Sequence, residues 1–135
     1  MSSSALQDKF ELRCFNSRDV LRVWHIYEPL IQKALDRGSN YTIDQVLEGL
    51  CSSAMQLWTW GLDAALVTTI QNDEKTRWCL LLALGGTNME TWKGYLPIVD
   101  DWARSKGCEE LRIYGRPGWA RLGFDIDYAK LVRKL

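Results

Sequence analysis

The chain has 135 residues with 17 basic and 17 acidic side chains, so its formal net charge is zero. This length is typical of one domain with a buried core. A chain that neutralises several phosphates usually shows a basic excess or stripe, and the only basic cluster here is Lys130, Arg133 and Lys134. We interpret that cluster as the solvated edge of a sheet, so nucleic acid is not expected as the main partner.

The termini, cysteines and tryptophans narrow the class of protein further. The first residues lack a basic segment followed by an apolar run, which predicts no secretory signal peptide, and no stretch approaches the ~20 apolar residues of a membrane span. Seven tryptophans indicate either a well-packed core or a contact surface. The four cysteines are far apart and accompany one histidine, so we expect reduced thiols and no metal site: Cys14, Cys51, Cys79 and Cys108.

The first elements in chain order are a strand and a long helix. Residues 10–15 alternate apolar and polar side chains, the period of a half-buried strand. Ser17 can cap a helix over residues 18–36, whose apolar residues recur at helical spacing. Pro29 lies inside this pattern and predicts a kink or a division into two helices, and Gly38 ends it.

A second helix and three strands follow. Thr42 and Gln45 have the spacing of a capping box and open a helix that should run to about Ser52. The last of the three strands is an almost continuous apolar run, which is typical of a central strand buried on both faces. The three strands are predicted over residues 55–60, 64–71 and 77–84.

The remaining third alternates helices and strands. An amphipathic helix over residues 90–106 contains Pro97 and ends before Gly107, a natural C-terminal cap. Its predicted inward side chains are Trp92, Tyr95, Leu96, Val99, Trp102 and Ala103. A strand over 110–114 follows this crossover and should therefore run parallel to the strand before it. A short helix over 116–122 and a last strand over 125–134 complete the chain.

This order of elements resembles that of the GNAT (GCN5-related N-acetyltransferase) superfamily over nearly the whole chain. The segment from Ala103 to Cys108 looks like the end of the family's third helix, and Gly123-Phe124 like the Gly-Phe pair after its fourth. The resemblance implies an α/β (α+β) fold with a central mixed sheet of six to seven strands, about four helices, and a single domain over residues 1–135. Residues 115–121, Gly-Arg-Pro-Gly-Trp-Ala-Arg, are similar to small GNAT-like proteins of tailed bacteriophages and prophages, some grouped with virion genes.

The resemblance implies a site for acyl-CoA, such as acetyl-CoA. In the family, main-chain groups of the central strand hold the pantetheine arm, and a glycine-rich loop at the next helix cradles the pyrophosphate. Glu90 and Trp92 fall near the family's loop glycines, where they would repel or obstruct the pyrophosphate, and the preferred interpretation of the glycine pair is a simple turn after a strand. The residues of this chain that correspond to the family's cofactor-binding strand and loop are Leu81, Leu82, Leu84, Gly85, Gly86, Thr87 and Asn88.

The acid and base of such a reaction are harder to assign. Trp119 stands where the family often places a tyrosine that protonates the departing thiolate, and an indole cannot do this near neutral pH. Tyr114 is a possible substitute, with Tyr128 weaker. Candidate bases each have a structural explanation as turn, surface or core residues, and Cys79 is better explained as core than as nucleophile. The candidate bases that could deprotonate the amine are Asp63, Asp73, Glu74 and His25.

Two functional hypotheses remain. The first is a phage-type GNAT-fold protein with a degenerate acyl-CoA site, acting as a virion-associated structural or binding module with protein partners, in the host cytoplasm or the virion. The alternative is an active acetyl-CoA-dependent N-acetyltransferase on an unknown amine. Fold alone does not decide between them, because function resides in the site.

Overall fold

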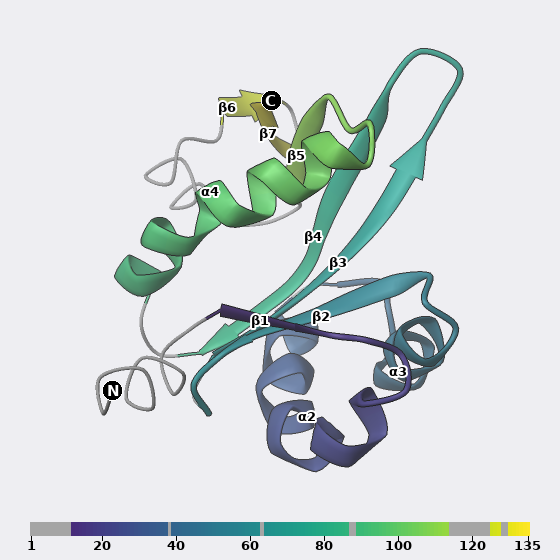
Figure 1. Cartoon of the computed structure of the whole chain (residues 1–135), viewed down its shortest axis with the longest axis vertical. Helices are drawn as coiled ribbons and strands as arrows, with labels where there is room; N and C mark the ends of the chain where they lie inside the picture. The colour runs from purple at the N-terminus through teal and green to yellow at the C-terminus, as the bar shows by residue number, and fades with distance from the viewer. Residues whose placement is uncertain (1–11, 38, 63, 87–88, 114–124, 128–129) are drawn as a thin grey trace, which may run out of the picture. The chain divides into compact units, whose positions relative to one another are not determined.

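The computed structural model describes residues 12–37, 39–62, 64–86, 89–113, 125–127 and 130–135 (Figure 1). Seven strands form one mixed sheet in the order β1-β2-β3-β4-β5-β7-β6, which confirms the expected sheet. Three helices lie in the described part of the chain, and the short helix expected over 116–122 falls outside it. The elements are β1 (Leu12–Phe15), α2 (Val20–Asp36), α3 (Ile43–Cys51), β2 (Met55–Trp60), β3 (Ala64–Asn72), β4 (Arg77–Gly86), α4 (Met89–Ser105), β5 (Glu110–Ile113), β6 (Asp125–Asp127) and β7 (Lys130–Lys134).

The described residues group into two compact units. The first contains β1, β2, α2, α3, the start of β3 and the end of β4. The second contains the rest of the β3–β4 pair together with α4, β5, β6 and β7.

In the first unit, α2 and α3 cover the antiparallel pair β1–β2 (Figure 1). The rings of Phe15 on β1 and Tyr27 on α2 lie 6.3 Å apart, and the Tyr27 hydroxyl donates a 2.7 Å hydrogen bond to the carbonyl of Gly61. On α3, Gly49 lies so close to Met55 of β2 that an added Cβ would meet its sulfur at 2.6 Å. Close packing of apolar faces, with one buried hydroxyl satisfied, holds the helices on the strands.

The start of α2 differs from the expected one. The helix begins at Val20, and Asp19 at the N-cap position makes no side-chain capping hydrogen bond. The Oδ1 atom of Asn16 instead accepts hydrogen bonds of 3.0 Å from the main-chain N–H groups of Arg18 and Asp19. The prediction that Ser17 caps the helix is therefore wrong, because the asparagine forms a turn with its own following backbone and delays the helix.

Pro29 does not divide α2. The helix is continuous from Val20 to Asp36 with Pro29 inside it, on an exposed position. The predicted division into two helices is therefore wrong. A proline removes a single helical hydrogen bond, and packing of the buried side chains on either side, such as Tyr27 and Ile31, keeps the helix together.

The capping box of α3 is confirmed. The Thr42 side chain accepts a hydrogen bond from the backbone N–H of Gln45 at 3.2 Å, and the Gln45 side chain accepts one from the backbone of Thr42 at 2.9 Å. The helix ends at Cys51 with Ser52 as its C-cap, one residue from the predicted end. Two otherwise unpaired donors are thus satisfied by local sequence alone.

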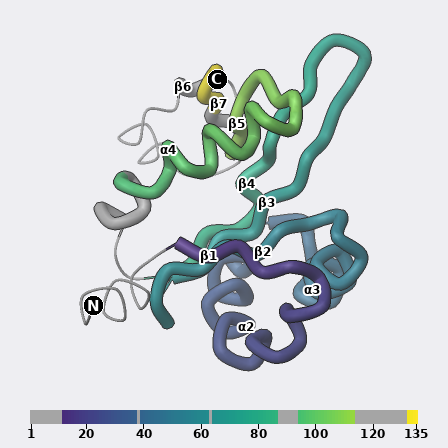
Figure 2. Tube along the Cα trace, in the orientation of Figure 1, coloured from purple at the N-terminus to yellow at the C-terminus, as the bar shows by residue number. Residues whose placement is uncertain are grey.

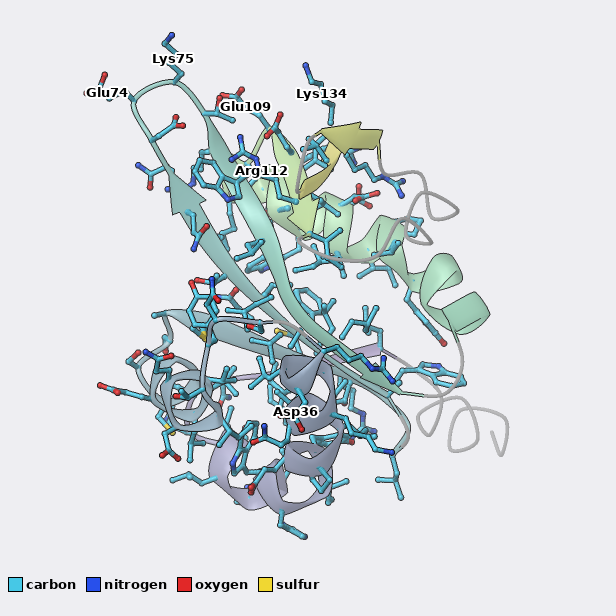
Figure 3. The ribbon with its side chains drawn as sticks, turned by 180° about the vertical axis from the view of Figure 1, so that it is seen from behind. Asp36, Glu74, Lys75, Glu109, Arg112 and Lys134 are labelled. Carbon is cyan, nitrogen blue, oxygen red and sulfur yellow. The ribbon has the colours of Figure 1, made fainter. Side chains whose placement is uncertain are left out.

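In the second unit, the outer parts of β3 and β4 form a hairpin (Figure 2). Asp73 closes its turn: its backbone N–H donates to the Thr76 carbonyl at 2.9 Å, and its Oδ1 accepts from the N–H groups of Lys75 and Thr76 at 2.8 and 2.7 Å. Glu74 and Lys75 lie exposed at this turn (Figure 3). Asp73 and Glu74 are therefore turn residues, as expected.

Helix α4 lies along β5 in the same unit (Figure 1). Its inward residues Leu96, Val99 and Ala103 are buried as predicted, and Tyr95 and Trp102 are half-buried. Strand β5 pairs in parallel with β4, as expected for a helical crossover.

The C-terminal segment forms two strands where one was expected. Strands β6 and β7 pair antiparallel, with Asp127 opposite Lys130, and β7 also pairs with β5. Because β7 lies between β5 and β6, the interpretation of Lys130, Arg133 and Lys134 as a sheet edge is wrong. The two residues between the strands are Tyr128 and Ala129, which carry no glycine or asparagine signal for a hairpin.

Candidate functional site

The candidate site is centred on the C-terminal part of β4. The register of β4 with β5 runs from Trp78 opposite Glu110 to Leu80 opposite Arg112. Continued at that register, the last residue of β5, Ile113, falls beside Leu81, and five further β4 residues follow up to Gly86. Main-chain groups of these last residues of β4 are the chemical means by which the strand could bind a ligand.

The predicted leucines of this segment alternate in burial. The Leu81 side chain is 2% exposed, and Leu82 and Leu84 are half-buried, with Ala83 buried between them. Alternation is the consequence of the two-residue period of a strand. A ligand held along this segment would be recognised through peptide N–H and C=O groups, since the apolar side chains supply no polar contact.

The two glycines that follow are the last residues of β4, so the prediction that they form a turn after the strand is wrong. Gly85 is buried, and a Cβ there would overlap the main-chain carbonyl of Leu30 on α2. Gly86 is exposed and has φ of 137°, a conformation that other residues rarely adopt. Each glycine thus has its own structural reason, and only Gly86 presents its backbone at the surface.

Several predicted site residues lie outside the described part of the chain. These include Thr87 and Asn88, the two residues between β4 and α4, and both proposed proton donors, Tyr114 and Trp119. Their roles stay predictions. The same holds for Tyr128, Asp63, and the side chains of Glu90 and Trp92.

Two of the described candidate bases, Asp73 and Glu74, do not lie at the end of β4. Asp73 and Glu74 lie in the β3–β4 turn, at the opposite end of a ten-residue strand from Gly86, about 30 Å along it at ~3.3 Å per residue. The backbone N–H groups of Thr76 and Lys75 lower the pKa of the Asp73 carboxyl, which makes it a weaker base. His25 is exposed on α2.

Cys79 is a core residue, as expected. Its side chain is fully buried on β4, and burial raises the pKa of its thiol to about 12, with a further increase from Cys108 nearby. A thiol with this pKa stays protonated at neutral pH and is a poor nucleophile.

Among the described residues, no group of three or more His, Cys, Asp or Glu side chains could hold a metal ion. None of the described helices is long and apolar enough to cross a membrane.

Two polar arrangements of the second unit were missed by sequence reasoning. Arg112 lies over the Trp78 ring at 3.8 Å from its centroid and donates a 2.6 Å hydrogen bond to Glu110. Asp100 on α4 is buried and paired with Arg133 on β7 at 2.8 Å. Helical spacing indicated the burial of Asp100, since it follows Leu96 by four residues and precedes Ala103 by three on the inward face.

Comparison with known proteins bears on the fold. No protein-family model matches this chain, and no curated protein matches it significantly, whereas 46 chains of solved structures do. A predicted acetyltransferase with acetyl-CoA from Clostridium acetobutylicum has a TM-score of 0.65 at 14% identity over 88% of this chain and 92% of its own. A GNAT-family acetyltransferase from Listeria monocytogenes has a TM-score of 0.58 at 10% identity over 93% and 95%.

A larger protein contains the same fold as one part. N-acetylglutamate synthase from Neisseria gonorrhoeae, complexed with coenzyme A and N-acetyl-glutamate, has a TM-score of 0.64 at 17% identity over 93% of this chain and 35% of its own. Identities this low establish architecture alone. The chain therefore has the mixed α/β fold of the GNAT acetyltransferases.

Proposed function

We propose that this chain is a GNAT-fold protein with a degenerate acyl-CoA site that acts as a structural or binding module, with other proteins of a phage particle as its partners. The observation that carries the proposal is the position of three described candidates for acid–base or nucleophilic chemistry. Asp73 and Glu74 lie at the far end of β4 from Gly86, and the Cys79 thiol is buried and protonated. Acyl transfer to an amine needs a base within hydrogen-bond reach of the amine, and none of these groups is placed for that at the end of β4.

The choice of protein partners rests on composition and on a local resemblance. Seven tryptophans in 135 residues is an unusual number, and tryptophan is enriched among the residues that dominate protein interfaces. Residues 115–121 are similar to phage and prophage GNAT-like proteins, which gives the class of particle. The zero net charge disfavours nucleic acid as the partner.

The alternative function is acetyl-CoA-dependent N-acetylation, and one observation favours it. Gly86 ends β4 and is exposed, and along the chain α4 begins three residues later at Met89. A strand edge followed by a glycine and a helix N-terminus is suited to a pantetheine arm and a pyrophosphate. Direct transfer depends mainly on positioning and on polarisation of the thioester, so the loss of one acid need not abolish it.

Calorimetric titration with acetyl-CoA and with CoA tests the two functions. The degenerate site predicts no binding, or weak binding without turnover when amines are added and released thiol is measured. Micromolar binding with thiol release would overturn the proposal and establish the enzyme. No heat at millimolar ligand would exclude the enzyme.

Two variants of one residue locate any binding that is found. Gly86→Ala and Gly86→Glu impose the same backbone strain at the positive φ, but only the second adds a negative charge. Binding of a pyrophosphate beside Gly86 predicts roughly five- to tenfold weaker affinity for the Glu variant than for the Ala variant. Equal affinities would place the ligand elsewhere.

A further inference from the structure

Asp100 is a buried carboxyl group in the second unit that has no part in the proposed function. It lies on the inward face of α4 with Val99 and Ala103, and the whole residue is 2% exposed. A helix with a 3.6-residue period cannot turn position 100 to solvent while it buries its neighbours on that face. The fold therefore removes this carboxyl group from water.

The burial is only partly compensated by a partner. The Arg133 guanidinium on β7 donates to Asp100 Oδ2 at 2.8 Å, and the second oxygen, Oδ1, is buried without a hydrogen-bond partner. Side-chain exposure is 3% for Asp100 and 29% for Arg133, so the arginine keeps access to solvent. A buried ion pair with one unsatisfied oxygen does not recover its full desolvation cost.

The other described charged or titratable groups that act on Asp100 lie on α4 and β4. Arg104 and Asp101, on the same helix, act in opposite directions on Asp100 and are paired with each other at the surface at 2.8 Å. The Cys79 thiol on β4 has a pKa of about 12 and stays neutral. Arg133 is therefore the main charged partner across the interface between α4 and β7.

These groups give the carboxyl an unusual titration. Burial raises the pKa of Asp100, and this effect outweighs the opposing attraction of Arg133 and Arg104. The packed state therefore binds the proton more tightly than the unpacked state does. Linkage then requires that the packed state be most stable with Asp100 protonated, and that it lose stability as the pH rises through the packed-state value.

We propose that Asp100 makes the docking of the C-terminal strand β7 on α4 dependent on protonation. Docking is tightest when Asp100 is neutral. Ionisation loosens the contact, and Arg133 then keeps the charged carboxylate in place. The pair is a proton-sensitive contact between α4 and β7, and its behaviour is opposite to that of a surface ion pair, which acid weakens.

Hydrogen exchange of the β7 main-chain amides in the intact chain tests this from pH 4 to 8, after correction for intrinsic exchange rates. Protection of β7 should fall as the pH rises through the Asp100 titration, by up to about tenfold for each unit by which the packed-state pKa exceeds the unpacked one. Asp100→Asn should remove this dependence. Asp101→Asn, at the exposed neighbouring position, should retain it.

Two further measurements keep the proposal falsifiable if Asp100→Asn does not fold. The ¹³Cγ resonance of Asp100 in the wild-type chain should titrate above the ordinary aspartate range, and Arg133→Met should move its midpoint higher. An Asp100 that titrates at or below the ordinary value would overturn the proposal. So would an unchanged pH dependence of β7 exchange in Asp100→Asn. Neither measurement involves acyl-CoA, so the outcome is independent of the proposed function.

Discussion

Strand β4 passes so close to helix α2 that a methyl group on Gly85 would overlap the main-chain carbonyl oxygen of Leu30. A long side chain could move aside, but a helical carbonyl is held by its own backbone and cannot. The requirement for glycine at position 85 thus comes from packing between α2 and β4. Of the Gly85-Gly86 pair, only Gly86 remains as the exposed candidate for ligand contact.

Gly85→Ala should therefore destabilise the chain by about 1–3 kcal/mol, the usual cost of overpacking. Gly94→Ala is the matched control, because a Cβ at Gly94 on α4 meets nothing within 4 Å. Alanine is the better helix former, so Gly94→Ala should stabilise by about 0.5–1 kcal/mol. Urea denaturation measures both, and equal effects of the two substitutions would contradict the contact with Leu30.

Thr42→Ala removes the hydroxyl that accepts a hydrogen bond from the Gln45 backbone N–H, and it retains the backbone N–H of residue 42 that donates to the Gln45 side chain. We expect a loss of about 1 kcal/mol in the free energy of unfolding. Thr42→Ser keeps the hydroxyl and should change stability by much less. A Ser variant as unstable as the Ala variant would show that the threonine methyl group, and not the cap, is what matters.

Two of the arginine–carboxylate pairs in the second unit, Arg112–Glu110 and Arg104–Asp101, should differ in strength. Arg112 and Glu110 have side chains 12% and 14% exposed, and Arg112 also stacks on Trp78. Arg112→Met should cost roughly 2–4 kcal/mol because it leaves Glu110 charged and poorly solvated. Arg104→Met, which breaks a pair with side chains 53% and 79% exposed, should change stability by less than about 0.5 kcal/mol.

The double variant Arg112→Met/Glu110→Gln separates these contributions. It should recover part of the stability lost in Arg112→Met, because the isolated charge is removed together with its partner. Thermal unfolding of the single and double variants provides the measurement. No recovery would mean that the stacking on Trp78, and not the ion pair, accounts for the loss.

The four cysteines should react with iodoacetamide in a set order at pH 8. Cys51 is exposed and should react first, and the buried Cys79 and Cys108 should react only when the chain unfolds. Cys14 is also exposed, but partial desolvation raises the pKa of its thiol to about 11, so only about a thousandth of it is thiolate at this pH and it should react more slowly than Cys51. Mass spectrometry of timed samples reads the order, and rapid labelling of Cys79 in the folded chain would contradict its burial.

Local signals in the sequence predicted most of the elements. The capping box of α3, the polar turn at Asp73 and the apolar run of β4 depend on neighbours within a few residues, and each is found where expected. The cap of α2 was wrong because Asn16 and Ser17 both favour turns and caps, and the sequence does not say which side chain takes the hydrogen bonds. The C-terminal hairpin was missed because its connection lacks the usual turn residues.

The candidate site was likewise predicted in part from the sequence. The assignment of Leu81 to Leu84 to the central strand followed from the pattern of apolar residues, whereas Gly85 and Gly86, expected to form a turn, belong to the same strand. The fold of the GNAT acetyltransferases followed from the order of elements. Whether the named proton donors and loop residues serve the site stays a prediction. The separation of Asp73 and Glu74 from Gly86 along the chain was already implied by the strand predicted between them, and the structure extends that strand to Gly86.

By itself the sequence determined most of the succession of helices and strands, with the C-terminal hairpin as the exception, since periodicity, caps and turns are properties of neighbouring residues. Tertiary structure alone decided what the glycine at position 85 is for and where the basic C-terminal residues lie. Glycine is needed at position 85 because the carbonyl of Leu30, more than fifty positions earlier, lies against it. Arg133 forms an ion pair with Asp100, which lies on another element. Such relationships depend on which surfaces meet when apolar area is buried, and a one-dimensional pattern does not carry that information.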